Sequence, residues 1–245
     1  MQIFFIIPIL LFSFLSSPIF GQNFRISSPK GIVADFSRGY NAARDGDYAS
    51  AVRWYTFAAD EGNAAAQYNL GVIYENGSGV AKQYKTAVRW YTLAADQGYA
   101  AAQYNLGVIY ENGSGVSQQY KTAVRWYTVA ADQGYVEAQY NLGVIYENGS
   151  GVAQEYGTAL RWYTLASAHG HANAQNNLGA MYYKGAGVQK SNAYAHIWFN
   201  IAASSGDTAN AQKNMDMVEK EMTIPEIKNA QSLARKCVAK KYTGC

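Results

Sequence analysis

Few side chains in this sequence have the types and the spacing that catalysis requires. Ser27-Ser-Pro-Lys30 matches S-x-x-K, the nucleophile motif of penicillin-recognising enzymes, but neither S-D-N nor K-T-G follows it. The histidines form no H-E-x-x-H pattern and no cluster with cysteine. We therefore interpret the S-x-x-K match as chance, and we expect no catalytic residue, no metal site and no cofactor.

Histidine occurs only in the last third of the chain, at His169, His171 and His196. His169 and His171 flank one glycine at a predicted helix end. A cation there would complement the helix dipole, so we expect a structural role for this pair.

The N-terminal residues predict export. Residues 3–15 are apolar and uncharged and are followed by small and polar residues, as in a signal peptide. We expect cleavage after Gly21 and a mature protein in the periplasm or outside the cell; an uncleaved anchor is the alternative, because the run approaches the roughly 17 residues that span a bilayer. In an exported protein we expect Cys237 and Cys245 to form a disulfide, with two unpaired thiols as the alternative.

The charge balance gives no sign of a polyanionic partner such as nucleic acid. Lysine and arginine together number 20, against 17 aspartates and glutamates. Arginines recur beside tryptophan, and we expect them to pack on aromatic rings or pair with glutamate rather than form an anion-binding stripe. These arginines are Arg53, Arg89, Arg125 and Arg161.

A period of 36 residues organises the chain. Residues 85–120 and 121–156 differ at only five positions, and the same frame extends to both sides and then fades. Such periodicity indicates a stacked array whose terminal units act as caps.

Each unit carries two helical patterns and a glycine loop. In the first pattern Leu70, Gly71 and Tyr74 share one face, and Gly71 leaves room for a neighbouring helix. In the loop, Gly77 suits the left-handed residue that ends a helix, and Val80 suits a hydrophobic plug after it. We therefore expect an antiparallel helix pair in every unit.

The ends of the array predict further helices. Residues 35–44 precede a glycine turn, and Thr223-Ile-Pro-Glu226 is a capping box that begins a helix reaching about residue 241. We expect about twelve helices in all. The expected segments are a signal peptide (1–21), a linker (22–33), an N-terminal capping helix pair (34–62), a repeat solenoid (63–206) and C-terminal capping helices (207–245).

The repeated residues resemble a known family. The pattern A-x-x-x-L-G-x-x-Y-x-x-G-x-G-V followed by A-x-x-W-Y-x-x-A-A-x-x-G, over about residues 36–205, resembles the Sel-1-like repeat, a relative of the tetratricopeptide repeat. The resemblance implies an all-α, right-handed solenoid of stacked helix pairs in a bacterial periplasmic protein. It also implies protein binding, without naming a partner.

One branch of this family bears on the hydrolase alternative. A cysteine-rich branch has been linked to β-lactamase activity and carries a disulfide in each repeat, with cysteines spaced as Cys237 and Cys245 are. The repeats of this sequence contain no cysteine. A β-lactamase-like hydrolase is therefore only a remote alternative.

The expected contact surface lies on the first helix of each unit, which lines the concave groove in related solenoids. Positions outside the core place tyrosine, valine, glutamate and asparagine on one face, which suits an extended peptide or partner protein and also the sugar rings of an envelope glycan such as peptidoglycan. Stacking of the tyrosines between repeats is the purely structural alternative. The candidate residues are Tyr68, Val72, Glu75, Asn76, Tyr104, Val108, Glu111, Asn112, Tyr140, Val144, Glu147 and Asn148.

Overall fold

The computed structural model describes residues 29–206 and 208–242, and these residues form twelve α-helices. The expected signal peptide, Ser27 and Cys245 lie outside the described residues. The helices are α1 (Pro29–Arg44), α2 (Tyr48–Asp60), α3 (Ala64–Asn76), α4 (Tyr84–Asp96), α5 (Ala100–Asn112), α6 (Tyr120–Asp132), α7 (Val136–Asn148), α8 (Tyr156–Ala168), α9 (Ala172–Lys184), α10 (Asn192–Ser205), α11 (Thr208–Glu219) and α12 (Ile224–Ala239).

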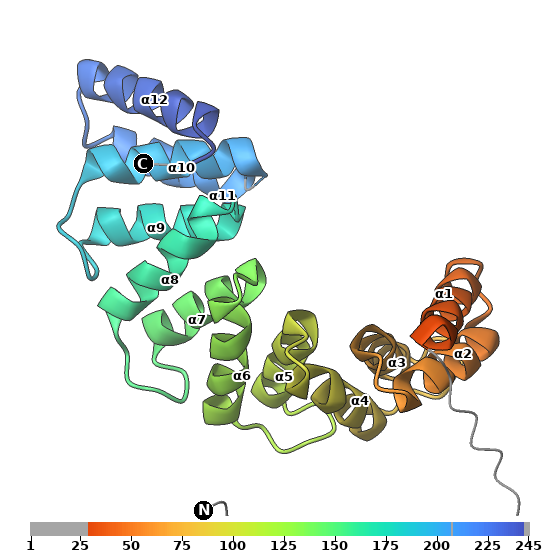
Figure 1. The fold of residues 1–245 in the computed structure, drawn as a ribbon. Helices are drawn as coiled ribbons and strands as arrows, with labels where there is room; N and C mark the ends of the chain where they lie inside the picture. The colour runs from red at the N-terminus through yellow and green to blue at the C-terminus, as the bar shows by residue number, and fades with distance from the viewer. Residues whose placement is uncertain (1–28, 207, 243–245) are drawn as a thin grey trace, which may run out of the picture.

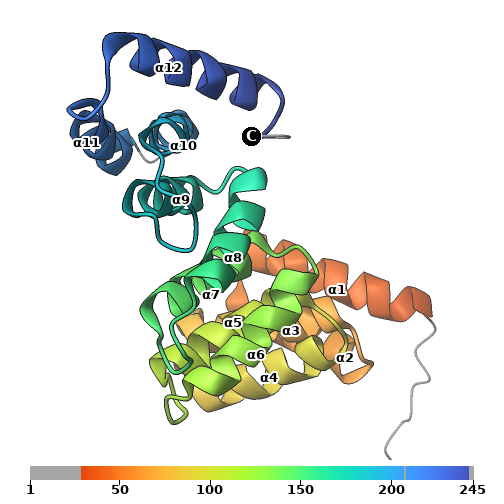
Figure 2. The same ribbon diagram turned by 90° about the vertical axis from the view of Figure 1, so that its left-hand side faces the viewer.

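The helices stack in chain order into an open arc (Figure 1). From α1 to α11 each helix packs on the next one along the chain, alternately within a unit and between units, and α12 packs on α10. Helices α3, α5 and α7 lie on the inner side of the arc, and α4 and α6 lie on the outer side. The side view shows α9 to α12 grouped at one end, with α12 packed on α10 (Figure 2). The predicted all-α solenoid of helix pairs is confirmed.

Within a unit, a glycine of the first helix accommodates an aromatic ring of the second. Tyr127 is fully buried, and a Cβ added to Gly107 would lie 2.5 Å from its Cδ1 atom. Only a residue without a side chain permits this approach, so the predicted role of Gly71 and its equivalents is confirmed. The same contact occurs in the pairs Gly39/Tyr55, Gly71/Tyr91, Gly143/Tyr163 and Gly179/Phe199.

The glycine loop ends the first helix and touches the preceding unit. Gly113 follows α5 in the left-handed conformation, with φ of 71°, and its N–H donates to the carbonyl of Ile109. Val116 then packs on the core of the same unit. A Cβ on Gly115 would overlap the Cβ of Tyr84, at the start of α4 in the unit before. These loops are architectural, as their sequence predicts.

The two ends of the described chain differ in how well their sequences predicted them. The capping box is present, because the N–H of Thr223 donates to the Glu226 carboxylate at 2.8 Å. Helix α1 begins at Pro29, so residues 29–33 of the expected linker are helical. Proline is favoured at this first helical position, where its missing N–H would have no partner within the helix.

Among the described residues, no helix combines the length and the apolarity needed to cross a bilayer.

Candidate functional site

Aromatic rings meet in pairs where one unit joins the next. Tyr68 of α3 lies 5.0 Å from Tyr99, which directly precedes α5, measured between ring centroids. Tyr104 and Tyr135 repeat this contact at 5.0 Å. In the third pair the imidazole of His171 stacks on the ring of Tyr140, with ring centroids 4.5 Å apart. We call this set the aromatic ribbon: Tyr68, Tyr99, Tyr104, Tyr135, Tyr140 and His171.

The second ring of each pair sits at the position that caps the following helix. Tyr99 has an extended backbone there and makes no side-chain cap hydrogen bond. In the first unit Asn63 occupies the equivalent place, and its side chain accepts from the N–H of Ala66 at 2.8 Å. His171 both caps its helix and stacks. Its Nδ1 accepts from the N–H of Ala174 at 3.2 Å, and its ring stacks on Tyr140.

The ribbon tyrosines are half-buried rather than fully exposed. Tyr68 also approaches Tyr91, with ring centroids 5.8 Å apart, so one side of its ring is fixed by the core of its own unit. Burial raises the pKa of Tyr68 and of Tyr104. Burial and the nearby Glu137 raise the pKa of Tyr135 to about 12. These phenols therefore stay protonated at neutral pH.

A second repeated contact joins the glutamate of the first helix to the buried tyrosine of the second. The hydroxyl of Tyr91 donates to Glu75 Oε2 at 2.6 Å. The same bond joins Tyr127 to Glu111 at 2.6 Å and Tyr163 to Glu147 at 2.7 Å. Burial and the bonded carboxylate raise the pKa of each buried tyrosine well above its usual range.

An asparagine of the following unit completes this contact. Asn177 Nδ2 donates to the hydroxyl of Tyr163 at 3.0 Å, and Asn105 bonds to Tyr91 in the same way. The predicted contact residues Tyr68 and Glu75 therefore lie at the seam between successive inner helices. Val72 is half-buried against the core of the next unit, and Asn76 is exposed at the end of α3. The equivalents in α5 and α7 share these environments: Tyr104, Val108, Glu111, Asn112, Tyr140, Val144, Glu147 and Asn148.

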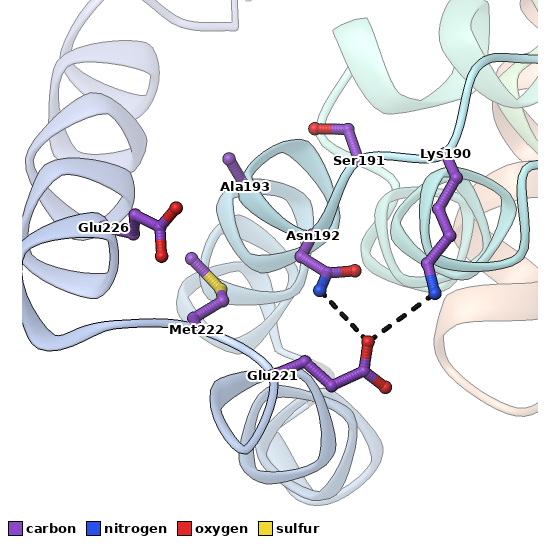
Figure 3. Close-up of a pocket in the computed structure, with 7 residues that line it drawn as sticks. All are labelled: Lys190, Ser191, Asn192, Ala193, Glu221, Met222 and Glu226. Carbon is purple, nitrogen blue, oxygen red and sulfur yellow. Dashed lines mark hydrogen bonds and ion pairs between the residues drawn. The ribbon is translucent and has the colours of Figure 1, made fainter.

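An open hollow of about 450 Å³ lies at the C-terminal end, between the start of α10 and the α11–α12 junction (Figure 3). Its lining groups bond to one another. Glu221 accepts from Tyr183 at 2.7 Å and from Asn192 at 3.1 Å, and it lies 3.5 Å from Lys190 Nζ. These three contacts, the Tyr183 hydroxyl first, lower the pKa of Glu221.

The hollow marks the place where the array stops. The loop glycine Gly187 of the last unit packs on the backbone of Tyr156, at the start of α8 in the preceding unit. Asn192 occupies the position equivalent to Tyr156, and the α11–α12 junction covers it in place of a further glycine loop. We therefore assign the hollow to the closing of the solenoid.

Other polar residues singled out from the sequence have structural surroundings. The Cζ atom of Arg89 lies 5.6 Å from the ring centroid of Trp90, in agreement with the expected packing on aromatic rings. Arg53 and Arg161 lie over their own neighbouring tryptophans in the same way. His171 caps the N-terminus of α9 as a hydrogen-bond acceptor, and burial lowers its pKa, so it does not act as a cation at a helix C-terminus. No group of three or more His, Cys, Asp or Glu among the described residues is placed to hold a metal.

Comparison with known proteins identifies the repeat. The family model described as Sel1 repeat matches residues 37–63, 64–99, 100–135, 136–171 and 172–207. The chain belongs to the Sel1 repeat family. No curated protein matches it in sequence.

Two examples of solved structures are similar to this Sel1 repeat protein. The first is c5321, a protective antigen present in uropathogenic Escherichia coli strains, with 34% identity and a TM-score of 0.78 over 86% of this chain. This chain spans only 46% of that protein. The second is a Sel1 repeat protein from Oxalobacter formigenes, with 36% identity and a TM-score of 0.69 over 72% of each chain. Sel1 repeat proteins are generally protein-interaction scaffolds and are typically non-catalytic.

Sequence reasoning found half of the ribbon in this Sel1 repeat protein. Tyr99, Tyr135 and His171 were missed, because they precede the first helix of a unit and helical periodicity does not place them. One signal was available. Tyr99 and Tyr135 recur 36 residues apart, each directly after a glycine.

Proposed function

We propose that this Sel1 repeat protein is a non-catalytic scaffold that binds an extended peptide or a partner protein along its aromatic ribbon. The observation that supports this is the ribbon itself, whose rings recur at each junction between the first helices of successive units, α3, α5, α7 and α9. Tyrosine provides rigid contact area with little loss of side-chain entropy and keeps a hydroxyl for hydrogen bonds.

The packing of the ribbon favours binding, because the rings are ordered before a partner arrives. Tyr68 contacts both Tyr91 and Tyr99, so its ring has two fixed neighbours. Ordering of side chains opposes association, and a face that is already ordered avoids much of that penalty.

A variant designed from the chain itself tests the ribbon. Tyr99→Asn/Tyr135→Asn removes two rings and introduces the residue that Asn63 supplies in the first unit, where it caps α3. This variant should therefore stay folded. Tyr68→Ala/Tyr104→Ala/Tyr140→Ala removes the other rings and is checked by circular dichroism. We expect both variants to lose partners that the wild type captures from extract of the source cells.

The matched control lies on the outer helices. Leu93, Val129 and Leu165 are exposed, at equivalent positions of α4, α6 and α8. Their joint replacement by alanine should leave capture unchanged. Equal recovery of partners by the wild type and by both ribbon variants would show that the ribbon is not the binding face.

Glycan binding is a second candidate, because the faces of the same rings suit the apolar faces of sugars. It predicts that purified peptidoglycan sacculi co-sediment the wild type and not the Tyr99→Asn/Tyr135→Asn variant. Failure of the wild type to sediment would remove it. The hydrolase alternative predicts turnover of nitrocefin, and its absence would close that alternative.

We also propose that the chain is exported, with residues 1–21 as a cleaved signal peptide and a disulfide between Cys237 and Cys245. Cys237 is buried on α12, so a bond there would anchor the C-terminal residues to the last helix. Mass spectrometry of the secreted or periplasmic protein tests both points. A mature chain that keeps Met1, or one with two alkylatable thiols, would contradict them.

A further inference from the structure

Charge is segregated between the inner and the outer helices of the arc. The inner helices α3, α5 and α7 contain no lysine or arginine, and their only charged residues are glutamates. The second helices of these units, α4, α6 and α8, carry arginines and lysines, which outnumber their aspartates. The inner glutamates are Glu75, Glu111, Glu137 and Glu147.

The inner carboxylates lack a cationic partner within the described part of the chain. The ion pairs found there involve Asp35, Asp45, Glu219 and Glu221, and none of the inner glutamates. Glu75 accepts from the hydroxyl of Tyr91, which is neutral and leaves the charge of the carboxylate uncompensated. Because the carboxylate is half-buried, solvent screens this charge less than it would on an open surface.

Each carboxylate lies close to the rings of the ribbon. Tyr91, which donates to Glu75, has its ring centroid 5.8 Å from that of Tyr68. Tyr127 links Glu111 to Tyr104 in the same way at 5.7 Å, and Tyr163 links Glu147 to Tyr140 at 6.0 Å. Each unit therefore offers an aromatic ring and an uncompensated carboxylate side by side. This combination favours an ammonium or guanidinium group, which gains from the ring face and from the charge together.

We infer that the segment bound along the ribbon is basic: an extended peptide segment with lysine or arginine side chains that recur along it. The inference rests on the proposed function and specifies its partner. Each of three units offers one pair of a tyrosine ring and a carboxylate. The pairs are Tyr68/Glu75, Tyr104/Glu111 and Tyr140/Glu147.

The fourth unit has no such pair of tyrosine and glutamate. Tyr183 stands where Glu147 stands in the unit before, and Lys184 stands where Asn148 stands. The carboxylate is lost and a positive charge is gained at this end. The acidic stretch therefore covers three units. Its end at the fourth unit fixes the position at which a bound basic segment would stop.

Fluorescence anisotropy with two labelled peptides tests the inference. One peptide repeats Lys-Pro-Ser along its length, and the other repeats Glu-Pro-Ser. We expect the lysine peptide to bind the wild type, more weakly as salt is raised, and the glutamate peptide not to bind. Glu75→Gln/Glu111→Gln/Glu147→Gln should weaken binding by about tenfold or more. The glutamine amide oxygen can still accept from the buried tyrosines, so this variant keeps the fold.

The control variant removes three carboxylates at the same 36-residue spacing from the outer helices. Asp60, Asp96 and Asp132 end α2, α4 and α6 and are exposed. Their joint replacement by asparagine should leave binding of the lysine peptide nearly unchanged. An equal loss in both variants would mean that net charge alone attracts the peptide, and the inference would be wrong.

Partner capture separates failure of this inference from failure of the proposed function. If captured partners are lost by Tyr99→Asn/Tyr135→Asn but fully retained by the triple glutamine variant, the ribbon binds and the basic segment is wrong. If neither variant loses partners, the proposed function itself fails. No binding of the lysine peptide by the wild type at low salt would also overturn the inference.

Discussion

Gln133 donates a hydrogen bond from Nε2 to Oε1 of Gln103 at 2.6 Å, so the residue that directly follows α6 holds the buried amide of α5. Gln103 in turn donates to the carbonyl of Ala95, at the end of α4. This chain of bonds joins three successive helices. It repeats in the unit before, where Gln97 donates to Gln67 at 2.7 Å.

The series breaks in the third unit, which yields a stability prediction. His169 occupies the place of Gln133, and Oε1 of the buried Gln139 has no hydrogen-bond partner. His169→Gln should supply the missing donor and raise the free energy of unfolding by about 1 kcal/mol. The reverse change, Gln133→His, should lower it by about 1–3 kcal/mol, since it strands the oxygen of Gln103. Urea denaturation measures both, and unchanged midpoints in the two variants would contradict the prediction.

The glycine contact inside each unit gives a second prediction. Gly107→Ala would place a Cβ 2.5 Å from the ring of Tyr127, which is fully buried and has no room to move. We expect the free energy of unfolding to fall by about 1–3 kcal/mol or more. Gly157 is the matched control, because it lies in α8 and no atom lies within 4 Å of its added Cβ. Gly157→Ala should stabilise the protein slightly, by up to about 1 kcal/mol. Similar gains in both variants would indicate that helix propensity, and not the tyrosine contact, decides the outcome.

The features of the fold and of the ribbon that could be predicted from the sequence are those set by residues close together in one unit. The helices, the loop glycines and the space beside Gly71 follow from periodicity within one unit, and they were predicted. The hydroxyl that engages Glu75 comes from Tyr91 on another helix, so its presence depends on how the two helices are set against each other. The ring of Tyr99 precedes a helix, where no periodic rule gives its direction. Only the stacking of units brings it to Tyr68.

The bond between Tyr127 and Glu111 gives a third prediction. Its two atoms lie 2.6 Å apart, and Tyr127 is fully buried. Tyr127→Phe should lower the free energy of unfolding by about 1–2 kcal/mol, because it removes a hydrogen bond to a charged group. Glu111→Gln should cost less, since its amide oxygen can still accept. In a double-mutant cycle we expect a coupling energy of about 0.5 kcal/mol or more. Strict additivity of the two changes would show that the bond contributes nothing to stability.

His171 makes the stability of the chain dependent on pH. Burial lowers the pKa of its imidazole below the ordinary 6.5, and Nδ1 accepts from the N–H of Ala174, which a protonated ring cannot do. The unfolded chain therefore takes up this proton more readily than the folded one. Stability from this group is fully present above about pH 6.5 and is lost as the pH falls through the lower folded-state value.

The variant His171→Asn tests this dependence, because Asn63 already caps α3 from the equivalent position. The cap should persist while the titrating ring disappears. We expect the wild type to lose more stability than the variant between about pH 7 and pH 5, measured by urea denaturation at each pH. His169→Gln removes a histidine elsewhere and serves as the control. If His171→Asn and the wild type lose stability in parallel as the medium is acidified, the imidazole is not the group responsible. The protonation of other side chains must then account for the loss.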